Sequence, residues 1–281
     1  MRNLIINPFR SSQSTIIILL LLFSCGYFAA QNYQITYEVK FKPITESNSF
    51  IKENMILKTV RGNSIFYNAN KAKIDSLVSI NDLKSIYSVE SSLLRLKVFK
   101  NRRKDHSIVG SNFNQFDYWY QEDKINYYNL SKLDKYKGYE ASEAFAKFGK
   151  REWQLIFTND IPIIDGPYVF SNLPGLVIKA TSLDGDYSFE LIEIKKLDDQ
   201  PVLKESKENI KKEKLVKIIH DFLKDPAIHQ IKFKNDIGDS FTYEFSGSKS
   251  SGAYNTTNEQ IEKIVQKFSN YPDKEVPILT F

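Results

Sequence analysis

Residues 166–177 read GPYVFSNLPGLV, an apolar stretch that contains two prolines and two glycines. Each proline fixes φ at about −65°, whereas glycine accepts positive φ. Asparagine is one of the few other residues that tolerate the left-handed region. We therefore predict special backbone conformations at Gly166, Asn172 and Gly175. No side chain in this stretch is a strong nucleophile or general base, so we interpret it as a backbone hinge that leads into the following hairpin.

Strand patterns follow this stretch and also occur near the N-terminus. Residues 176–181 and 187–194 are apolar runs separated by Asp184-Gly185, a pair typical of tight hairpin turns. Residues 33–42 alternate strictly, which predicts a strand with one buried face and one wet face. The 20 Phe and 16 Tyr residues also favour strands. We predict a β-rich α+β fold: a curved, mainly antiparallel sheet, either an open barrel or sandwich-like, with a few peripheral helices.

The rest of the chain fits a single domain over residues 31–281. Apolar residues at helical spacing predict helices near 71–87, 207–224 and 258–269. Residues 93–99 have strand character. With 281 residues, of which 42% are hydrophobic, the chain is long enough to bury a large core.

Residues 1–30 have the pattern of a secretory signal peptide. Arg2 and Arg10 precede an apolar run at 15–23, and small residues end the segment at Ala30. The run is shorter than the roughly 20 apolar residues that a membrane-spanning helix needs. We therefore expect an exported protein, located in the periplasm or associated with the outer membrane.

The only cysteine, Cys25, leaves two forms of the mature protein open. It follows Leu-Phe-Ser and resembles a bacterial lipobox, so lipidation would tether the protein to a membrane. Ordinary cleavage before Gln31 would instead leave a mature chain without a thiol. Loss of Arg2 and Arg10 with the leader lowers the formal net charge from +5 to +3. This small surplus does not indicate a nucleic-acid partner.

Aromatic residues are concentrated between residues 113 and 128. Tyr118, Trp119 and Tyr120 are consecutive there, and Trp153 lies in a strand predicted over 152–158. These four side chains are candidates for a ligand-facing aromatic surface. The other interpretation, which we favour, is that they fill the core of a sheet. The sequence leaves both interpretations open.

A basic run follows the segment with strand character at 93–99. Its members are Lys97, Lys100, Arg102, Arg103 and Lys104, with His106 beside them. Such a run is typical either of a patch that binds an anion or a nucleic acid or of a solvated turn between strands. We favour the turn, because no aromatic residues interleave with the basic ones.

Candidates for catalysis or metal binding are few. The three histidines, His106, His220 and His229, do not have metal-ligand spacing. The best acidic candidates for acid–base work are Asp160, Asp165, Asp184 and Asp186. Their position in predicted turns is, however, what turn chemistry alone favours. We predict neither a metal site nor a cofactor.

Residues 138–191 resemble the GLPGLI family of exported Bacteroidetes proteins. The namesake motif matches residues 172–177, with Asn172 in place of its first glycine and Val177 in place of its last isoleucine. Ala141 stands where relatives often carry a cysteine. The residues that carry the resemblance are Asp160, Pro162, Gly166, Pro167, Asn172, Leu173, Pro174, Gly175 and Leu176, together with Gly149-Lys150-Arg151 and Trp153. The resemblance implies an exported, β-rich envelope protein and implies no catalytic residues.

The expected function is that of a non-enzymatic envelope module that binds or assembles with a peptide, a lipid or a partner protein. Abundant aromatic residues and the lack of a catalytic constellation in the sequence favour it. The alternative is a hydrolase or divalent-cation-dependent enzyme that uses turn carboxylates such as Asp160 and Asp165. We expect no nucleic-acid partner, and membrane association only through a lipidated Cys25.

Overall fold

The computed structural model describes residues 32–277, with gaps at 105, 114–115, 199–209, 225–231, 235–239, 243–258, 260–261 and 264. The predicted signal peptide, Cys25 and His229 lie outside the described residues. Of the helix predicted over 258–269, the described residues 259, 262–263 and 265–267 are helical, whereas 268 and 269 are described and are not helical.

Among the described residues, eleven strands form one large sheet, and two short strands form a second sheet. In chain order, the strands are β1 (Asn32–Phe41), β2 (Ile51–Val60), β3 (Asn63–Asn68), β4 (Lys97–Asn101), β5 (His106–Phe113), β6 (Phe116–Asp123), β7 (Tyr127–Tyr136), β8 (Tyr139–Phe148), β9 (Arg151–Thr158), β10 (Leu176–Ser182), β11 (Tyr187–Leu197), β12 (Lys232–Lys234) and β13 (Ser240–Thr242). The order across the large sheet is β6-β5-β4-β3-β2-β1-β11-β10-β9-β8-β7. All of the named strands pair antiparallel.

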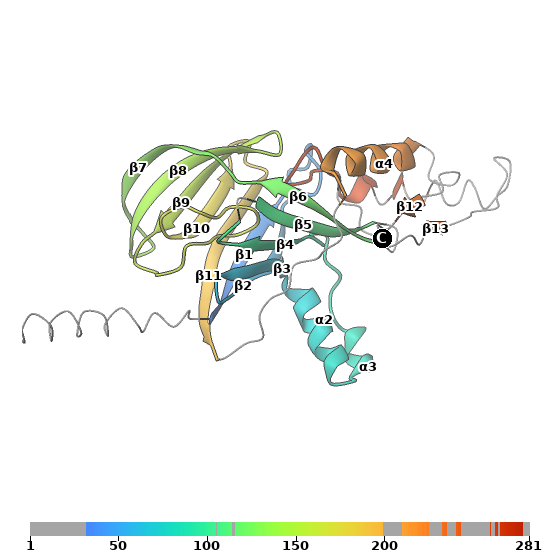
Figure 1. The fold of residues 1–281 in the computed structure, drawn as a ribbon, viewed down its shortest axis with the longest axis horizontal. Coiled ribbons are helices and arrows are strands. Elements are labelled where there is room, and N and C mark those ends of the chain that lie inside the picture. The colour runs from blue at the N-terminus through green and yellow to red at the C-terminus, as the bar shows by residue number, and fades with distance from the viewer. Residues whose placement is uncertain are drawn as a thin grey trace, which may run out of the picture.

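The two edges of the large sheet are joined by a very short connection. β6 and β7 lie at opposite edges, yet only residues 124–126 separate them in the chain. A connection of this length spans at most about 14 Å. The sheet must therefore curl until its edges approach each other at this end, and Figure 1 shows this curvature. The prediction of a curved, mainly antiparallel, open sheet with few helices is confirmed.

The clearest predicted strand and hairpin both form. In β1, the alternating side chains of Ile35, Tyr37, Val39 and Phe41 are completely buried. β10 and β11 pair across the turn that contains Gly185, which has a φ of 75°. Local sequence pattern is sufficient at both places because strand alternation and turn conformation are short-range properties.

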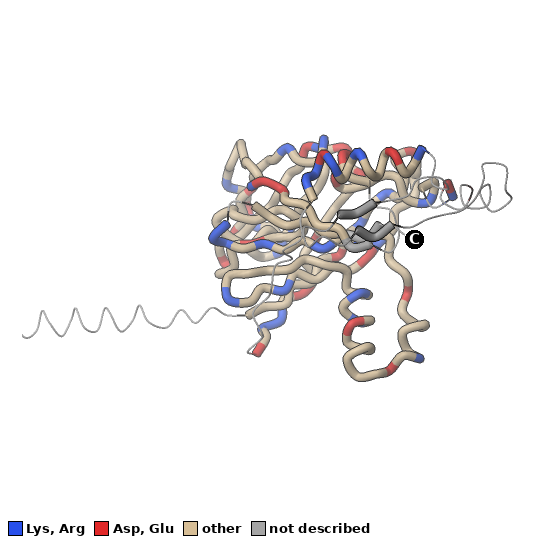
Figure 2. Tube along the Cα trace, turned by 45° about the vertical axis from the view of Figure 1, so that its right-hand side comes forward, with Lys and Arg blue, Asp and Glu red and all other residues tan. Residues whose placement is uncertain are grey.

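The helices lie outside the sheet. α2 (Ala69–Ser79) and α3 (Leu83–Ile86) fall in the segment predicted near 71–87 and contain no buried residue. They form an arm, residues 69–92, that projects away from the sheet (Figure 1 and Figure 2). α4 (Lys212–Lys224) falls in the segment predicted near 207–224 and buries Leu215, Ile219 and Phe222.

The strand predicted over residues 93–99 is wrong in its first half. The backbone N–H groups of Leu93 and Leu94 donate to the Glu53 carboxylate, at 2.7 and 3.3 Å. A side chain therefore replaces the strand ladder at these residues, and β4 begins only at Lys97.

The connection between β9 and β10, residues 159–175, folds into the interior of the curled sheet. Tyr168 stacks on Phe189 of β11, and Phe170 packs against Trp153 of β9. Side chains of β4 and β7 hydrogen-bond to its backbone, and a side chain of β1 hydrogen-bonds to its exit into β10. Strands from both halves of the sheet thus touch this inner loop. The concave side is filled by the protein's own chain, so the predicted hinge is instead a part of the core.

Candidate anion-binding cleft

Three polar side chains from different strands hold the backbone of the inner loop and its exit into β10. The Tyr37 hydroxyl of β1 donates to the Val177 carbonyl at 2.7 Å. Lys100 of β4 donates to the Gly166 carbonyl. The Tyr127 hydroxyl of β7 donates to the Ser171 carbonyl at 2.7 Å and accepts from the Ser171 N–H at 3.1 Å. Buried backbone groups need such partners, so these contacts fix the path of a loop that has no regular ladder.

The backbone conformations of the inner loop agree only in part with those predicted from the sequence. Asn172 and Gly175 have φ values of 68° and 147°, which confirms the prediction for both. Gly166 is not among the residues with positive φ, so the prediction for it is wrong. It needs glycine for a different reason, because a Cβ there would lie 2.5 Å from the Phe170 carbonyl oxygen. No sequence pattern predicts the positive φ of Tyr168, which is 52°.

The other motif residues shape the ends of the inner loop. Pro174 lies within a three-residue turn in which the Gly175 N–H donates to the Leu173 carbonyl at 2.8 Å. Pro167 begins a turn that the Phe170 N–H closes at 3.1 Å. Leu173 and Leu176 are buried in the core. Pro162 is exposed at the start of the loop.

A buried ion pair joins the inner loop to β4. Lys100 Nζ lies 2.6 Å from Asp165 Oδ1, and the two side chains are only 5% and 8% exposed. Burial lowers the pKa of Lys100, and the charge of Asp165 opposes that effect. Burial, and secondly the charge of Asp165, raise the pKa of Tyr37 well above its usual range. Asp165 is therefore committed to a structural pair and is poorly placed to act as a general base.

The predicted basic run meets the inner loop in a small cleft, with Lys100 and Asp165 at its floor. The residues that line it are Gly62, Ser64, Lys100, Asn101, Arg102, Lys104, His106, Ser107, Lys124, Ile125, Ile164, Asp165, Val169, Ser171 and Asn172. Four Lys or Arg residues against one Asp give this basic cleft a formal charge of +3, with His106 neutral. The cleft is also lined by hydroxyl and amide side chains from β3, from the β4–β5 hairpin and from the inner loop, namely Ser64, Asn101, Ser107, Ser171 and Asn172.

The turn between β4 and β5 positions two of the basic residues. The Arg102 N–H donates to the Gly62 carbonyl at 3.1 Å, and the Lys104 N–H donates to the Asn101 carbonyl at 3.0 Å. Both side chains are exposed, as is that of Lys124 from the connection between β6 and β7. Fixed backbone with exposed cationic ends is a suitable arrangement for binding an anion.

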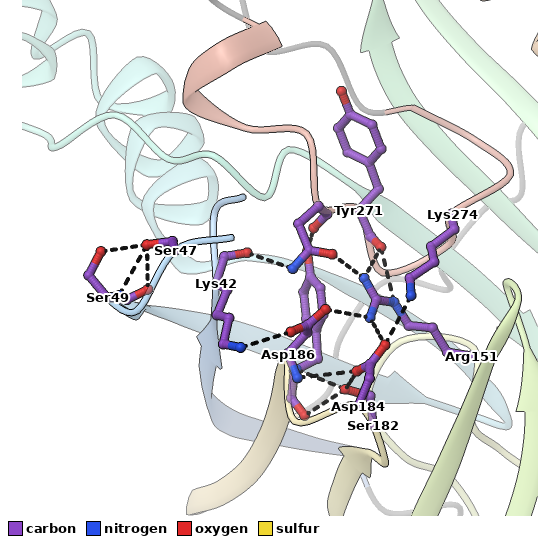
Figure 3. A network of polar contacts seen from close by, with 11 residues as sticks. Lys42, Ser47, Ser49, Arg151, Ser182, Asp184, Asp186, Tyr271 and Lys274 are labelled. Carbon is purple, nitrogen blue, oxygen red and sulfur yellow. Dashed lines mark hydrogen bonds and ion pairs between the residues drawn. The ribbon is translucent and has the colours of Figure 1, made fainter. Parts of the chain in front are cut away.

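Two other predicted acidic candidates belong to a structural network around Arg151, which is shown in Figure 3. The buried Arg151 guanidinium pairs with Asp184 and lies 3.1 Å from Asp186. It also donates to the Tyr271 carbonyl at 3.0 Å. Burial opposes ionisation of Asp184, but hydrogen bonding from Ser182 and the charge of Arg151 outweigh it and hold the pKa of Asp184 below its usual value. The network fastens residues 270–271 to the sheet.

The last acidic candidate, Asp160, stands apart from the others. Its side chain accepts a hydrogen bond from the Glu140 N–H at 2.8 Å on an exposed turn. His220 is exposed on α4. Within the residues that the structure describes, no group of three or more His, Cys, Asp or Glu side chains is arranged to hold a metal ion.

Most of the aromatic candidates belong to the core. Trp153 is completely buried and packs against Phe170, so its assignment to a ligand-facing surface is wrong. Tyr118 and Tyr120 are 4% and 2% exposed and line an internal cavity of ≈ 10 Å³, room for about one water molecule. Trp119 is partly exposed, and its ring covers Gly110. Aromatic abundance here reflects core packing, because the inner loop occupies the concave side.

Comparison with known proteins does not identify this one. No family model matches the chain, and no curated protein matches it. Two solved structures, "Structure of PNGF-II in C2 space group" and "Structure of PNGF-II in P21 space group", are each similar at 19% identity and a TM-score of 0.44. The match covers 61% and 64% of this chain but only 28% and 31% of theirs. This similarity is too low to carry an inference about activity. Among the described residues, no helix is both long and apolar enough to cross a membrane.

Proposed function

We propose that this protein is a non-enzymatic binding module of the cell envelope that holds an anionic group of its ligand in the basic cleft. The observation that carries the proposal is the convergence of Arg102, Lys104 and Lys124 with the clamped inner loop at Ser171 and Asn172. The leader pattern in the sequence supports an exported location. The ligand is a peptide, a lipid or a partner protein that carries a carboxylate, phosphate or sulfate.

The chemistry of the cleft favours binding over catalysis. Its one carboxylate, Asp165, is paired with Lys100 at 2.6 Å and buried. Arg102, Lys104 and Lys124 are exposed side chains on ordered backbone, and cationic groups placed in this way attract and orient anions. The other predicted acidic candidates are held in an ion pair with Arg151 or in the turn at Asp160. No observation specifically favours the hydrolase alternative.

Inorganic phosphate is a direct probe of the cleft. Calorimetric titration should show phosphate binding to the wild type, weakened at least tenfold in the double variant Arg102→Ala/Lys104→Ala. Removing the same charge from the arm, in Lys71→Ala/Lys73→Ala, is the matched control and should leave binding unchanged. Binding should also weaken as salt rises, because exposed charges are screened. Equal phosphate affinity in the wild type and the cleft variant would overturn the proposal.

A further inference from the structure

A second depression is lined in part by the same connection between β6 and β7. It is a groove of ≈ 380 Å³ lined by Glu122, Asp123, Lys124, Ile125, Asn126, Tyr128, Lys147 and Phe148. This volume is within the range of small-molecule sites, about 300–1,000 Å³. Lys124 and Ile125 line both the groove and the basic cleft. The two depressions are thus neighbours that meet at this short connection.

The groove differs from the cleft in its chemistry. Ile125, Tyr128 and Phe148 give it an apolar wall. The Tyr128 hydroxyl is already engaged as a donor to Glu152, which leaves the ring as its contribution to the groove. A ligand that removes the apolar side chains of such a wall from water lowers the free energy of the complex.

The charges of the two depressions also differ. Among the residues that line the groove, Glu122 and Asp123 balance Lys124 and Lys147, so the groove has no net formal charge. The Glu122 carboxylate lies 2.9 Å from Lys212 Nζ, and Asp123 is exposed at the rim. Without a net positive charge, the groove does not attract a second anionic group. Positive charge is concentrated in the cleft, at Arg102, Lys104 and Lys124. The pair of depressions therefore complements a ligand with one anionic end and an uncharged, apolar body.

We propose that the cleft and the groove form one composite site for a single anionic amphiphile. Its phosphate, sulfate or carboxylate head lies in the basic cleft, and its alkyl chain crosses Ile125 into the groove against Tyr128 and Phe148. This inference rests on the proposed function and adds the ligand class. A peptide with several acidic residues fits less well, because the groove has no net positive charge to attract the charges that lie outside the cleft.

A chain-length series tests the composite site. The full chain is titrated with inorganic phosphate and with butyl, hexyl and octyl phosphate, each below its micelle-forming concentration. Every methylene that enters the groove should tighten binding about fourfold, the equivalent of about 0.8 kcal/mol per buried methylene. Octanol, which lacks the anionic head, should bind at least tenfold more weakly than octyl phosphate.

Groove variants then locate the chain. Tyr128→Ser and Ile125→Ser should each reduce the ratio of octyl to butyl phosphate affinity at least threefold. The control Leu130→Ser, at an exposed position of the same strand as Tyr128, should retain the wild-type ratio. The use of two groove variants keeps the test valid if one of them fails to fold.

The outcomes separate the two proposals. If the wild type binds inorganic phosphate through Arg102 and Lys104 but shows no dependence on chain length, the composite site is wrong and the anion cleft stands. If no phosphate compound binds, both proposals fail. Binding to phosphatidylglycerol vesicles without binding to monomeric octyl phosphate would indicate a membrane surface as the ligand and would also overturn the composite site.

Discussion

Two long connections between neighbouring elements of the sheet fold in opposite directions. The inner loop, residues 159–175, turns into the concave side, whereas the arm, residues 69–92, projects into solvent (Figure 1). Tyr168 and Phe170 of the loop are almost completely buried, but Leu83 and Tyr87 of the arm are 56% and 93% exposed. Both segments contain apolar side chains, so hydrophobicity alone does not decide the direction.

The difference lies in how each segment satisfies its backbone polar groups. The arm forms helices, whose backbone hydrogen bonds are internal, and is fixed to the sheet at its base, where Asn68 and Leu93 donate to Glu53 at 2.8 and 2.7 Å. The inner loop has little internal structure and depends on Tyr37, Lys100 and Tyr127. A segment can enter the core without a ladder when other strands supply its hydrogen bonds.

The largest effect is expected at Gly175 of the inner loop. A Cβ there would lie 2.1 Å from the Thr158 carbonyl oxygen, and φ is 147°. Gly175→Val should therefore abolish the cooperative thermal transition, with a loss of more than about 4 kcal/mol. Gly185→Ala is the control: its φ is 75°, but no atom lies within 4 Å of the new Cβ, so a loss of about 1 kcal/mol is expected. Equal melting temperatures for the two variants would contradict the tight packing of the loop.

The next largest effect is expected from breaking the buried ion pair. Lys100→Met leaves Asp165 buried and unpaired, which should cost about 3–5 kcal/mol in the free energy of unfolding. Lys71→Met breaks an exposed pair with Asp75 on the arm, 2.7 Å apart, and should cost less than about 1 kcal/mol. Urea denaturation of both variants measures the two losses in the free energy of unfolding. Similar losses would contradict the structural importance of the buried pair.

A smaller, pH-dependent effect is expected at the base of the arm. Burial raises the pKa of Glu53 above its usual value, although hydrogen bonds from Leu93 and Leu94 oppose the shift. A raised pKa means that folding favours the protonated form, so this contribution to stability is present below about pH 4.5 and is lost as pH rises through the folded pKa. Glu53→Gln lacks this titration. The melting temperature of Glu53→Gln relative to the wild type should therefore increase between pH 4.5 and pH 7, and a constant difference would refute the shift.

The smallest effect is expected at the end of the arm. Leu83→Ser should change the free energy of unfolding by less than about 0.5 kcal/mol, because the side chain is 56% exposed. Phe170→Ala in the inner loop should cost about 3–5 kcal/mol, since it removes a completely buried ring. A large loss in Leu83→Ser would show that the arm packs against another part of the protein.

The sequence predicted those features that depend on neighbouring residues. The alternation of β1, the Asp184-Gly185 hairpin and the positive φ of Asn172 are all short-range. The direction of the inner loop was missed, because the side chains that hold it are distant in the chain: Tyr37 and Val177 are 140 positions apart, and Lys100 and Gly166 are 66 apart. No local pattern encodes such a pairing.

The candidate site was predicted only in part for the same reason. The basic run at 100–104 was visible in the sequence, but on its own it resembles a solvated turn. In the structure, Lys124 and Asn172 line the same cleft as this run, which makes the run part of a candidate anion-binding site. Only the curled sheet brings these residues together. The abundant aromatic residues favoured a binding surface, whereas the structure places most of the aromatic candidates in the core. Abundance alone does not distinguish a filled core from an open surface.

Hydrogen exchange with and without octyl phosphate tests the central claim most directly, namely that a rigidly held inner loop builds an anion-binding cleft. Without ligand, residues 163–177 should exchange as slowly as β9, and residues 69–92 much faster. Added octyl phosphate should slow exchange at residues 100–104 and 124–128 and leave residues 69–92 unchanged. Rapid exchange in the inner loop, or no change at residues 100–104 with saturating ligand, would contradict the account.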